Sequence, residues 1–210
     1  MDGHFDQGLG LERLLFFSDA VMAIAITLLA IDLKIPEIPA ALASTELPRQ
    51  LDALGPRIVS FVISFVVIGI YWSSHHRYFG YVRRYDGRLI ALNLLFLMFI
   101  ALMPFVASLL GQYPTVPLGV IVYAAAVAAI GFTLAAMWYY MTSGHRLVDA
   151  NLDDAFIRNR TIIAIVSPIP FLVSIPLALV SEVAALVVWW LGPFVALGLL
   201  RYLERKGSAA

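Results

Sequence analysis

Six long runs of apolar residues follow one another along the chain, each bounded by charged residues or by Pro and Gly. A helix needs roughly 20 mainly apolar residues to cross a bilayer, and each run is about that long. The chain has 210 residues, of which 61% are hydrophobic and 13% charged, which is too apolar for a soluble domain of this size. We therefore expect an all-α integral membrane protein. The predicted spans are residues 14–34, 57–77, 89–111, 116–143, 160–180 and 183–203.

Lysine and arginine are distributed unevenly between the two ends of these spans. With both termini on one side, eleven cations lie on that side, namely Arg13, Arg77, Arg83, Arg84, Arg88, Arg146, Arg158, Arg160, Arg201, Arg205 and Lys206. The other side holds Lys34, Arg49 and Arg57. Because cytoplasmic loops carry the excess of Lys and Arg, this asymmetry predicts six spans with both termini in the cytoplasm.

Charge and composition also exclude several classes of protein. A net charge of +0 argues against a nucleic-acid partner, which a strongly basic face would normally bind. The absence of cysteine excludes disulfides and thiolate metal sites. Residues 35–55 form the longest polar link, and the prolines at 104, 168, 170 and 176 predict kinks within spans.

The chain carries one six-helix unit. We find no internal duplication, so we expect a single transmembrane domain over residues 1–210. A symmetric pore would then require several copies of the chain.

Asp19 is a carboxylate inside the first apolar run. Facing lipid, it would cost at least about 2.5 kcal/mol, so it needs a partner. Arg13 lies on the same helix, and three further candidates lie near the cytoplasmic end of the second run. These are Trp72, His75 and His76.

Two interpretations of these polar residues remain open. Asp19 could form a proton relay or a metal site with His75 or His76, or it could belong to a polar clamp that ties three helices together, with Asn93 from the third run. Adjacent histidines point about 100° apart on a helix, so both can hardly bind one ion. We favour the clamp.

A stripe of large apolar side chains follows another face of the first run. It consists of Phe17, Ile24 and Ile31, flanked by Thr27 and Leu28. At 100° per residue, Asp19 lies about 140° around the helix from Ile24. The stripe and the carboxylate therefore face different surroundings, and on periodicity alone the stripe would pack against another helix or lipid.

Residues 13–20, RLLFFSDA, resemble the signature of the transmembrane protein 175 family of potassium channels and their bacterial homologues. The resemblance continues in VMAIAITLLAIDLKI at 21–35, YWSSHHRYF at 71–79 and NLLFLMFIALMPF at 93–105. Bacterial members have one six-helix repeat, so the resemblance implies a homotetramer in the inner membrane of a bacterial cell, with a central pore lined by the first helix.

The resemblance further implies a potassium-permeable channel of modest selectivity, narrowed by aliphatic side chains in place of a carbonyl filter. It implies a constriction at Ile24, with Leu28 and Ile31 one and two turns further out and Thr27 as a polar neighbour. The residues implied to anchor the pore helix are Arg13, Phe17, Ser18, Asp19, Trp72, His75 and Asn93. The implied partners are the lipid bilayer, copies of the chain and permeant potassium, with no cofactor and no bound metal.

Two other functions remain as alternatives. A proton-coupled or proton-conducting transporter would use Asp19 and His75, but the inverted repeats typical of transporters are missing. An intramembrane hydrolase could use Ser18 or Ser73 as its nucleophile, but neither lies in a G-x-S-x-G context and the sequence has no HExxH motif. We do not expect an enzyme.

Overall fold

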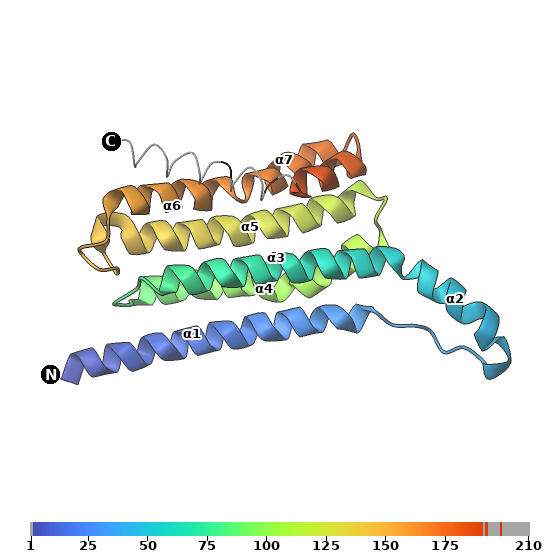
Figure 1. Ribbon diagram of the computed structural model, residues 1–210, viewed down its shortest axis with the longest axis horizontal. Coiled ribbons are helices and arrows are strands. Elements are labelled where there is room, and N and C mark those ends of the chain that lie inside the picture. Colours follow the sequence, from blue (N-terminus) through green and yellow to red (C-terminus); the bar gives the residue numbers. More distant parts are fainter. Residues whose placement is uncertain (1, 191, 193–197, 199–210) are drawn as a thin grey trace.

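The computed structural model describes residues 2–190 together with 192 and 198. All secondary-structure elements of this part of the chain are α-helices or 3₁₀ helices. The elements are α1 (Asp2–Leu28), η1 (Leu29–Asp32), η2 (Ala40–Leu42), α2 (Ala43–Ala53), α3 (Gly55–Phe79), α4 (Gly87–Gln112), α5 (Pro117–Thr142), η3 (Ser143–His145), α6 (Asp154–Val166) and α7 (Ile169–Ala178). Figure 1 shows α1, α3, α4, α5 and α6 running roughly side by side along one axis.

Five stretches of the described chain are long and apolar enough to cross a bilayer. They are Gly8–Asp32, Gly55–Phe79, Gly87–Gln112, Pro117–His145 and Asp154–Ala178, and they match the first five predicted spans. The sixth predicted span, 183–203, falls largely outside the described residues. Within it, residues 183–190, 192 and 198 are helical.

Local sequence signals set where several helices begin. Pro56 lies in the first turn of α3 and Pro117 opens α5, positions where a missing backbone N–H costs no hydrogen bond. Asp86 caps α4 by accepting the backbone N–H of Leu89 at 2.9 Å. Asp153 caps α6 in the same way through Phe156, at 2.8 Å.

The prolines act differently in different spans. The fifth span is broken between α6 and α7 at Ser167 and Pro168, as the proline content there predicts. Pro104, in contrast, lies within a continuous α4.

The polar link between the first two spans contains a helix that the sequence analysis does not predict. In α2 the leucines at 47 and 51 lie on one face, and an exposed Arg49–Glu46 pair at 3.2 Å lies on the same short helix. Figure 1 shows α2 projecting beyond the end of the bundle. Both leucines are exposed, so α2 contributes nothing to the core of this chain.

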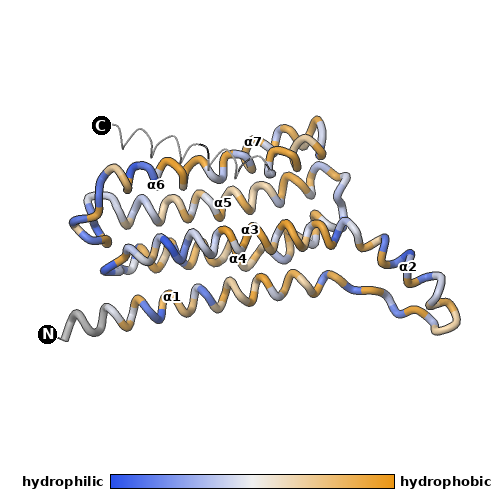
Figure 2. The backbone as a smooth tube through the Cα atoms, viewed as in Figure 1, coloured by the Kyte–Doolittle hydropathy of each residue, from blue (hydrophilic) through white to orange (hydrophobic). Residues whose placement is uncertain are grey.

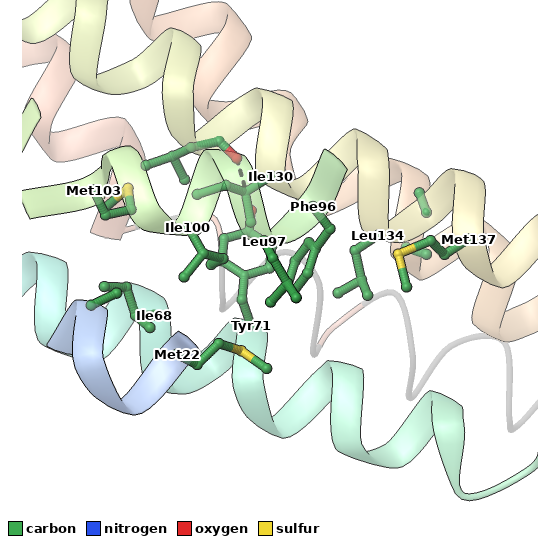
Figure 3. Packing of buried hydrophobic residues seen from close by; sticks show 14 of the residues in the cluster. Met22, Ile68, Tyr71, Phe96, Leu97, Ile100, Met103, Ile130, Leu134 and Met137 are labelled. Carbon is green, nitrogen blue, oxygen red and sulfur yellow. Dashed lines mark hydrogen bonds between the residues drawn. The ribbon is translucent and has the colours of Figure 1, made fainter. Parts of the chain in front are cut away.

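The core joins the first four spans, with α5 the most buried of them. Figure 3 shows side chains from α1, α3, α4 and α5 meeting there, with Met22 as the contribution from α1. Gly131 on α5 permits a close approach within the core, because a Cβ there would lie 2.6 Å from the Pro168 ring and 2.7 Å from the Tyr71 hydroxyl. α1 packs against α3 and α4, and its backbone does not come close to that of α5, α6 or α7.

Polar residues gather at the ends of the bundle, and Figure 2 shows hydrophobic colour along the middle of the helices. One end brings together the start of α1, the α3–α4 turn, the α5–α6 connection and the start of α6. Two of these turns are joined, because the backbone N–H of Arg83 donates to the Leu147 carbonyl at 2.8 Å. All eight described cations of the larger predicted group lie in these segments or in the adjoining ends of α3 and α4.

Candidate functional site

α1 has one packed face. Ser18, Met22, Ala25 and Leu29 are all buried, and their spacing of three and four residues places them on one side of a helix. This face lies against α3 and α4, and it fixes how α1 is rotated within the chain.

The other face of α1 is apolar, and the described residues of this chain leave it uncovered. Ile24 is 57% exposed, Leu28 42% and Ile31 54%. We call these three residues the apolar stripe. These residues belong to the set, with Phe17, that the sequence periodicity separates from Asp19, and the structure places them on the face of α1 that the described chain leaves exposed.

The C-terminal part of the stripe, at Ile31, has a different backbone geometry from the one predicted. The α-helix ends at Leu28, and Ile31 lies in the 3₁₀ turn η1, whereas a continuous helix to residue 34 is predicted. A 3₁₀ turn has 3.0 residues per turn, so the angle of 100° per residue does not extend to Ile31. Its exposure still places it on the open side.

Thr27 lies next to the stripe and is also exposed. Its hydroxyl donates to the backbone carbonyl of Ile24 at 2.8 Å. The hydrogen is thus used within the helix, and the lone pairs of Oγ1 remain available to accept or to coordinate a cation.

Three buried polar side chains connect α1, α3 and α4 on the packed side. His75 bonds through Nε2 to Oδ1 of Asn93 at 2.9 Å, and Nδ2 of Asn93 donates to Oγ of Ser18 at 2.8 Å. Ser18 in turn donates to the Leu14 carbonyl at 2.8 Å. Since Asn93 accepts through Oδ1, His75 carries its proton on Nε2, and the chain of bonds has a single direction.

The His75 ring is enclosed by aromatic rings. It stacks on Phe79 at 4.3 Å and on Phe96 at 5.3 Å between ring centroids, and its Nδ1 atom has no hydrogen-bond partner among the described residues. The ring is fully buried. This surrounding suits a neutral, packed side chain.

Asp19 belongs to a separate contact. Nε1 of Trp72 donates to its Oδ1 at 2.8 Å, and the Trp72 ring stacks on His76 at 5.7 Å. Asp19 and His75 therefore have different partners, with no hydrogen bond between them, so the structure does not contain the direct relay of the alternative interpretation.

Two predicted anchoring residues lie outside these contacts. Arg13 is exposed and forms no ion pair with Asp19. Phe17 is half exposed on the open side of α1. Among the described residues no group of three or more His, Cys, Asp or Glu side chains could hold a metal ion.

A second carboxylate inside the first span escaped the sequence analysis. Asp32 accepts a hydrogen bond from the Ser108 hydroxyl of α4 at 2.9 Å, and Gln112 donates to that same hydroxyl at 2.6 Å. Asp32 could have been found by the reasoning applied to Asp19, since it too is a charge within a predicted span. It attaches the C-terminal end of the first span to α4.

Comparison with known proteins identifies the same part of the chain. Residues 13–104 match the family model described as "Endosomal/lysosomal potassium channel TMEM175". This segment contains the apolar stripe and the hydrogen-bonded residues Ser18, Asp19, Trp72, His75 and Asn93, whereas the Asp32–Ser108 contact extends beyond it.

Similar proteins are found in bacteria and animals. A potassium channel of Streptomyces collinus is 36% identical over 169 residues, which cover 79% of this chain and 81% of that protein. The human endosomal/lysosomal proton channel TMEM175 is 32% identical over 130 residues, 60% of this chain and 25% of the human protein. The crystal structure of a lysosomal potassium-selective channel TMEM175 homolog from Chamaesiphon minutus superposes with a TM-score of 0.71 at 28% identity, covering 94% of this chain and 97% of that one.

Proposed function

The chain belongs to the TMEM175 family, and from this premise we propose that it is a potassium-permeable, modestly potassium-selective cation channel. The observation that carries the proposal is the uncovered apolar stripe on α1. An apolar face left open on a membrane helix can meet lipid, copies of the chain or a pore. Membership in a family of channels favours the pore for the face that carries the stripe. Members of the family are channels, and we propose neither an enzymatic role nor a cofactor.

The pore requires several copies, because one α1 cannot enclose a path. We propose a homotetramer of a single six-helix domain over residues 1–210, with α1 of each subunit around the central axis. The membrane orientation has both termini in the cytoplasm of a bacterial cell, and the gathering of the described cations at one end of the bundle supports it.

In this assembly the stripe forms the constriction, with Ile24 as its narrowest level. An apolar ring blocks ions by closing or by dewetting, and it opens when the helices move apart or rotate. An apolar ring offers few ligands to replace the water molecules that an ion loses on entering it. It therefore favours the cation with the lower free energy cost of dehydration, which is potassium rather than sodium. The hydroxyl oxygen of Thr27, next to the stripe on α1, could replace one water ligand of a passing ion. With this single oxygen per subunit, we expect only a modest preference for potassium over sodium.

The test is ion flux in liposomes that hold the purified protein, with potassium and then sodium as the only cation. The proposal expects flux with both and faster flux with potassium. A flux of either cation no faster than in protein-free liposomes would contradict the proposal. Mass measurement in mild detergent tests the assembly, and a monomer that conducts would contradict the tetramer.

A second candidate is proton conduction, because the human relative is named a proton channel. Protons could use the pore itself or a path through Asp19 and His75. A pH-sensitive dye inside the same liposomes measures proton entry, and the variants Asp19→Asn and His75→Gln separate the two routes. If both variants keep the proton flux of the parent chain, the polar clamp is not the path.

A further inference from the structure

A groove on the far side of α3 from α1 lies between α3, α5 and α6, with Phe171 of α7 and residues 189, 190 and 192 completing its lining. Its volume is about 410 Å³, within the range of small-molecule sites, and its walls are mostly aliphatic and aromatic. Val66 and Ile70 line it from α3, Leu134 and Ala135 from α5, and Ile163 from α6. Because the backbone of α1 does not come close to that of α5 or α6, this groove is separate from the apolar stripe.

One end of the groove carries two positive charges. Arg77 of α3 and Arg160 of α6 both line it, together with Tyr78 and Tyr81. Both helix segments lie at the end of the bundle where the cations gather. Amphipathic tyrosines are typical of the level at which lipid headgroups begin.

Neither arginine is neutralised by a carboxylate of the described chain. Arg77 donates to the Ser74 hydroxyl at 3.3 Å, and the Arg160 guanidinium lies 5.2 Å from the centre of the Phe156 ring. The ion pairs among the described residues involve neither of them. Two guanidinium groups thus face the mouth of an apolar groove and have donors left for an anion.

We propose that this groove binds one anionic phospholipid of the cytoplasmic leaflet in each subunit. Its phosphate lies between Arg77 and Arg160, and an acyl chain lies along α3. From Arg77 to Val62 the groove follows fifteen residues of helix, about 22 Å. This exceeds the ~15 Å of hydrocarbon in one leaflet, so a whole acyl chain is accommodated.

The charge and the shape of the groove favour a lipid over a second copy of the chain. A lipid supplies a phosphate at the depth of the arginines and a hydrocarbon chain beyond it, in the order in which the groove presents cations and then apolar walls. Basic pockets between membrane helices on the cytoplasmic side are known to hold anionic headgroups in this way.

The experiment is native mass spectrometry of the full-length protein in a neutral detergent, titrated with dioleoyl phosphatidylglycerol or dioleoyl phosphatidylcholine. We expect one phosphatidylglycerol per subunit to remain bound under conditions that remove phosphatidylcholine. Arg77→Gln and Arg160→Gln should each weaken phosphatidylglycerol binding by about fivefold, and the double variant by about 25-fold.

Matched controls test charge and groove separately. Arg158 lies on the opposite face of α6 from Arg160 and Arg83 lies at the same end of the bundle, and both are exposed and outside the groove. The double variant Arg83→Gln with Arg158→Gln should bind phosphatidylglycerol like the parent chain. Val66→Trp, at a half-exposed groove position, should reduce binding without any change of charge.

Several results would overturn the proposal. The first is equal retention of phosphatidylglycerol and phosphatidylcholine. The second is unchanged phosphatidylglycerol binding by the double variant Arg77→Gln with Arg160→Gln. The third is a loss of phosphatidylglycerol binding in the double variant Arg83→Gln with Arg158→Gln as large as in the double variant of the groove. If Val66→Trp separates the subunits and leaves the bound lipid unchanged, the groove is a contact between copies. If inorganic phosphate protects the protein from heat as well as phosphatidylglycerol does, the arginines bind an anion and the groove binds no lipid. None of these results depends on ion conduction.

Discussion

Ile24 and Ala25 are neighbours in the sequence and face opposite surroundings, since Ile24 is 57% exposed and Ala25 only 2%. One step along a helix turns the chain by about 100°, which is enough to pass from the packed face of α1 to its open face. The polar contacts of Ser18 and Asp19 hold that rotation in place. If these contacts orient α1, they should affect stability and assembly, whereas residues of the stripe should affect conduction.

The Trp72–Asp19 hydrogen bond should contribute to stability and not to ion preference. Trp72→Phe keeps an aromatic ring against His76 and removes the indole donor, leaving Asp19 without it. We expect the free energy of unfolding to fall by about 0.5–1.5 kcal/mol, the usual net contribution of one hydrogen bond, because Trp72 is 43% exposed and Asp19 is only partly buried. Thermal unfolding in detergent measures this loss, and the potassium to sodium flux ratio should stay that of the parent chain.

Asp19→Asn is the matched variant for this contact, because its amide oxygen can still accept from Trp72. It should be milder than Trp72→Phe. If Asp19→Asn changes the flux ratio while the thermal transition is unchanged, Asp19 acts in the conduction path and the clamp interpretation is wrong.

Ser18 and Asn93 should be energetically coupled. Ser18→Ala and Asn93→Ala each break the same bond between α1 and α4, so the double variant should lose less stability than the sum of the two single variants. Hydrogen bonds between membrane helices contribute about 0.6 kcal/mol on average and at most about 1.7, so the coupling energy should lie in that range. Additive losses would mean that the 2.8 Å contact carries no net energy.

Asp86 gives the stability of the α4 start a dependence on pH. Burial raises the pKa of this carboxyl, but hydrogen bonds from Tyr140 and from the Leu89 and Arg88 backbone, with the nearby Arg146 charge, outweigh burial and hold the pKa below its ordinary value. A folded pKa below the unfolded one stabilises the fold above the unfolded value of 3.8, and this contribution is lost as the pH falls through the folded pKa.

Asp86→Asn should therefore lower the melting temperature at pH 7 by about 2–4 °C, and the difference should shrink below pH 4. Asparagine caps a helix about as well as aspartate, so the variant removes the charge and keeps the cap. The control is Asp52→Asn, at an exposed position at the other end of the bundle. A difference that is the same at pH 3 and pH 7 would mean that the charge of Asp86 is unimportant.

The spans were the most predictable part of the fold, because length and apolarity are properties of the sequence alone. Five helical stretches of the described chain, each long and apolar enough to cross a bilayer, coincide with the first five predicted spans. Periodicity also separated Ile24 from Asp19, since it needs only a regular helix. It does not extend to Ile31, because where an α-helix tightens into a 3₁₀ turn depends on packing such as the Asp32–Ser108 contact.

The partners of the polar residues were less predictable. The sequence placed Asp19, Trp72, His75 and Asn93 in one leaflet, but not in pairs. Which histidine is buried depends on the rotation of α3 against α4, and one residue of rotation would exchange His75 for His76. The lipid groove left no pattern in the sequence, because Arg77 and Arg160 are 83 residues apart and meet only through the packing of α6.

The central claim is that the apolar stripe of α1 narrows the pore, and Ile24→Ala tests it most directly. The measurement is single-channel conductance together with the reversal potential in opposing potassium and sodium, in bilayers that contain the purified protein. Ile165→Ala, an exposed isoleucine on α6 away from α1, is the matched control. Removing bulk from a ring of four isoleucines should widen and wet it, so conductance should rise and the preference for potassium should fall, while the control does neither. Unchanged conductance and reversal potential in Ile24→Ala would show that the constriction lies elsewhere.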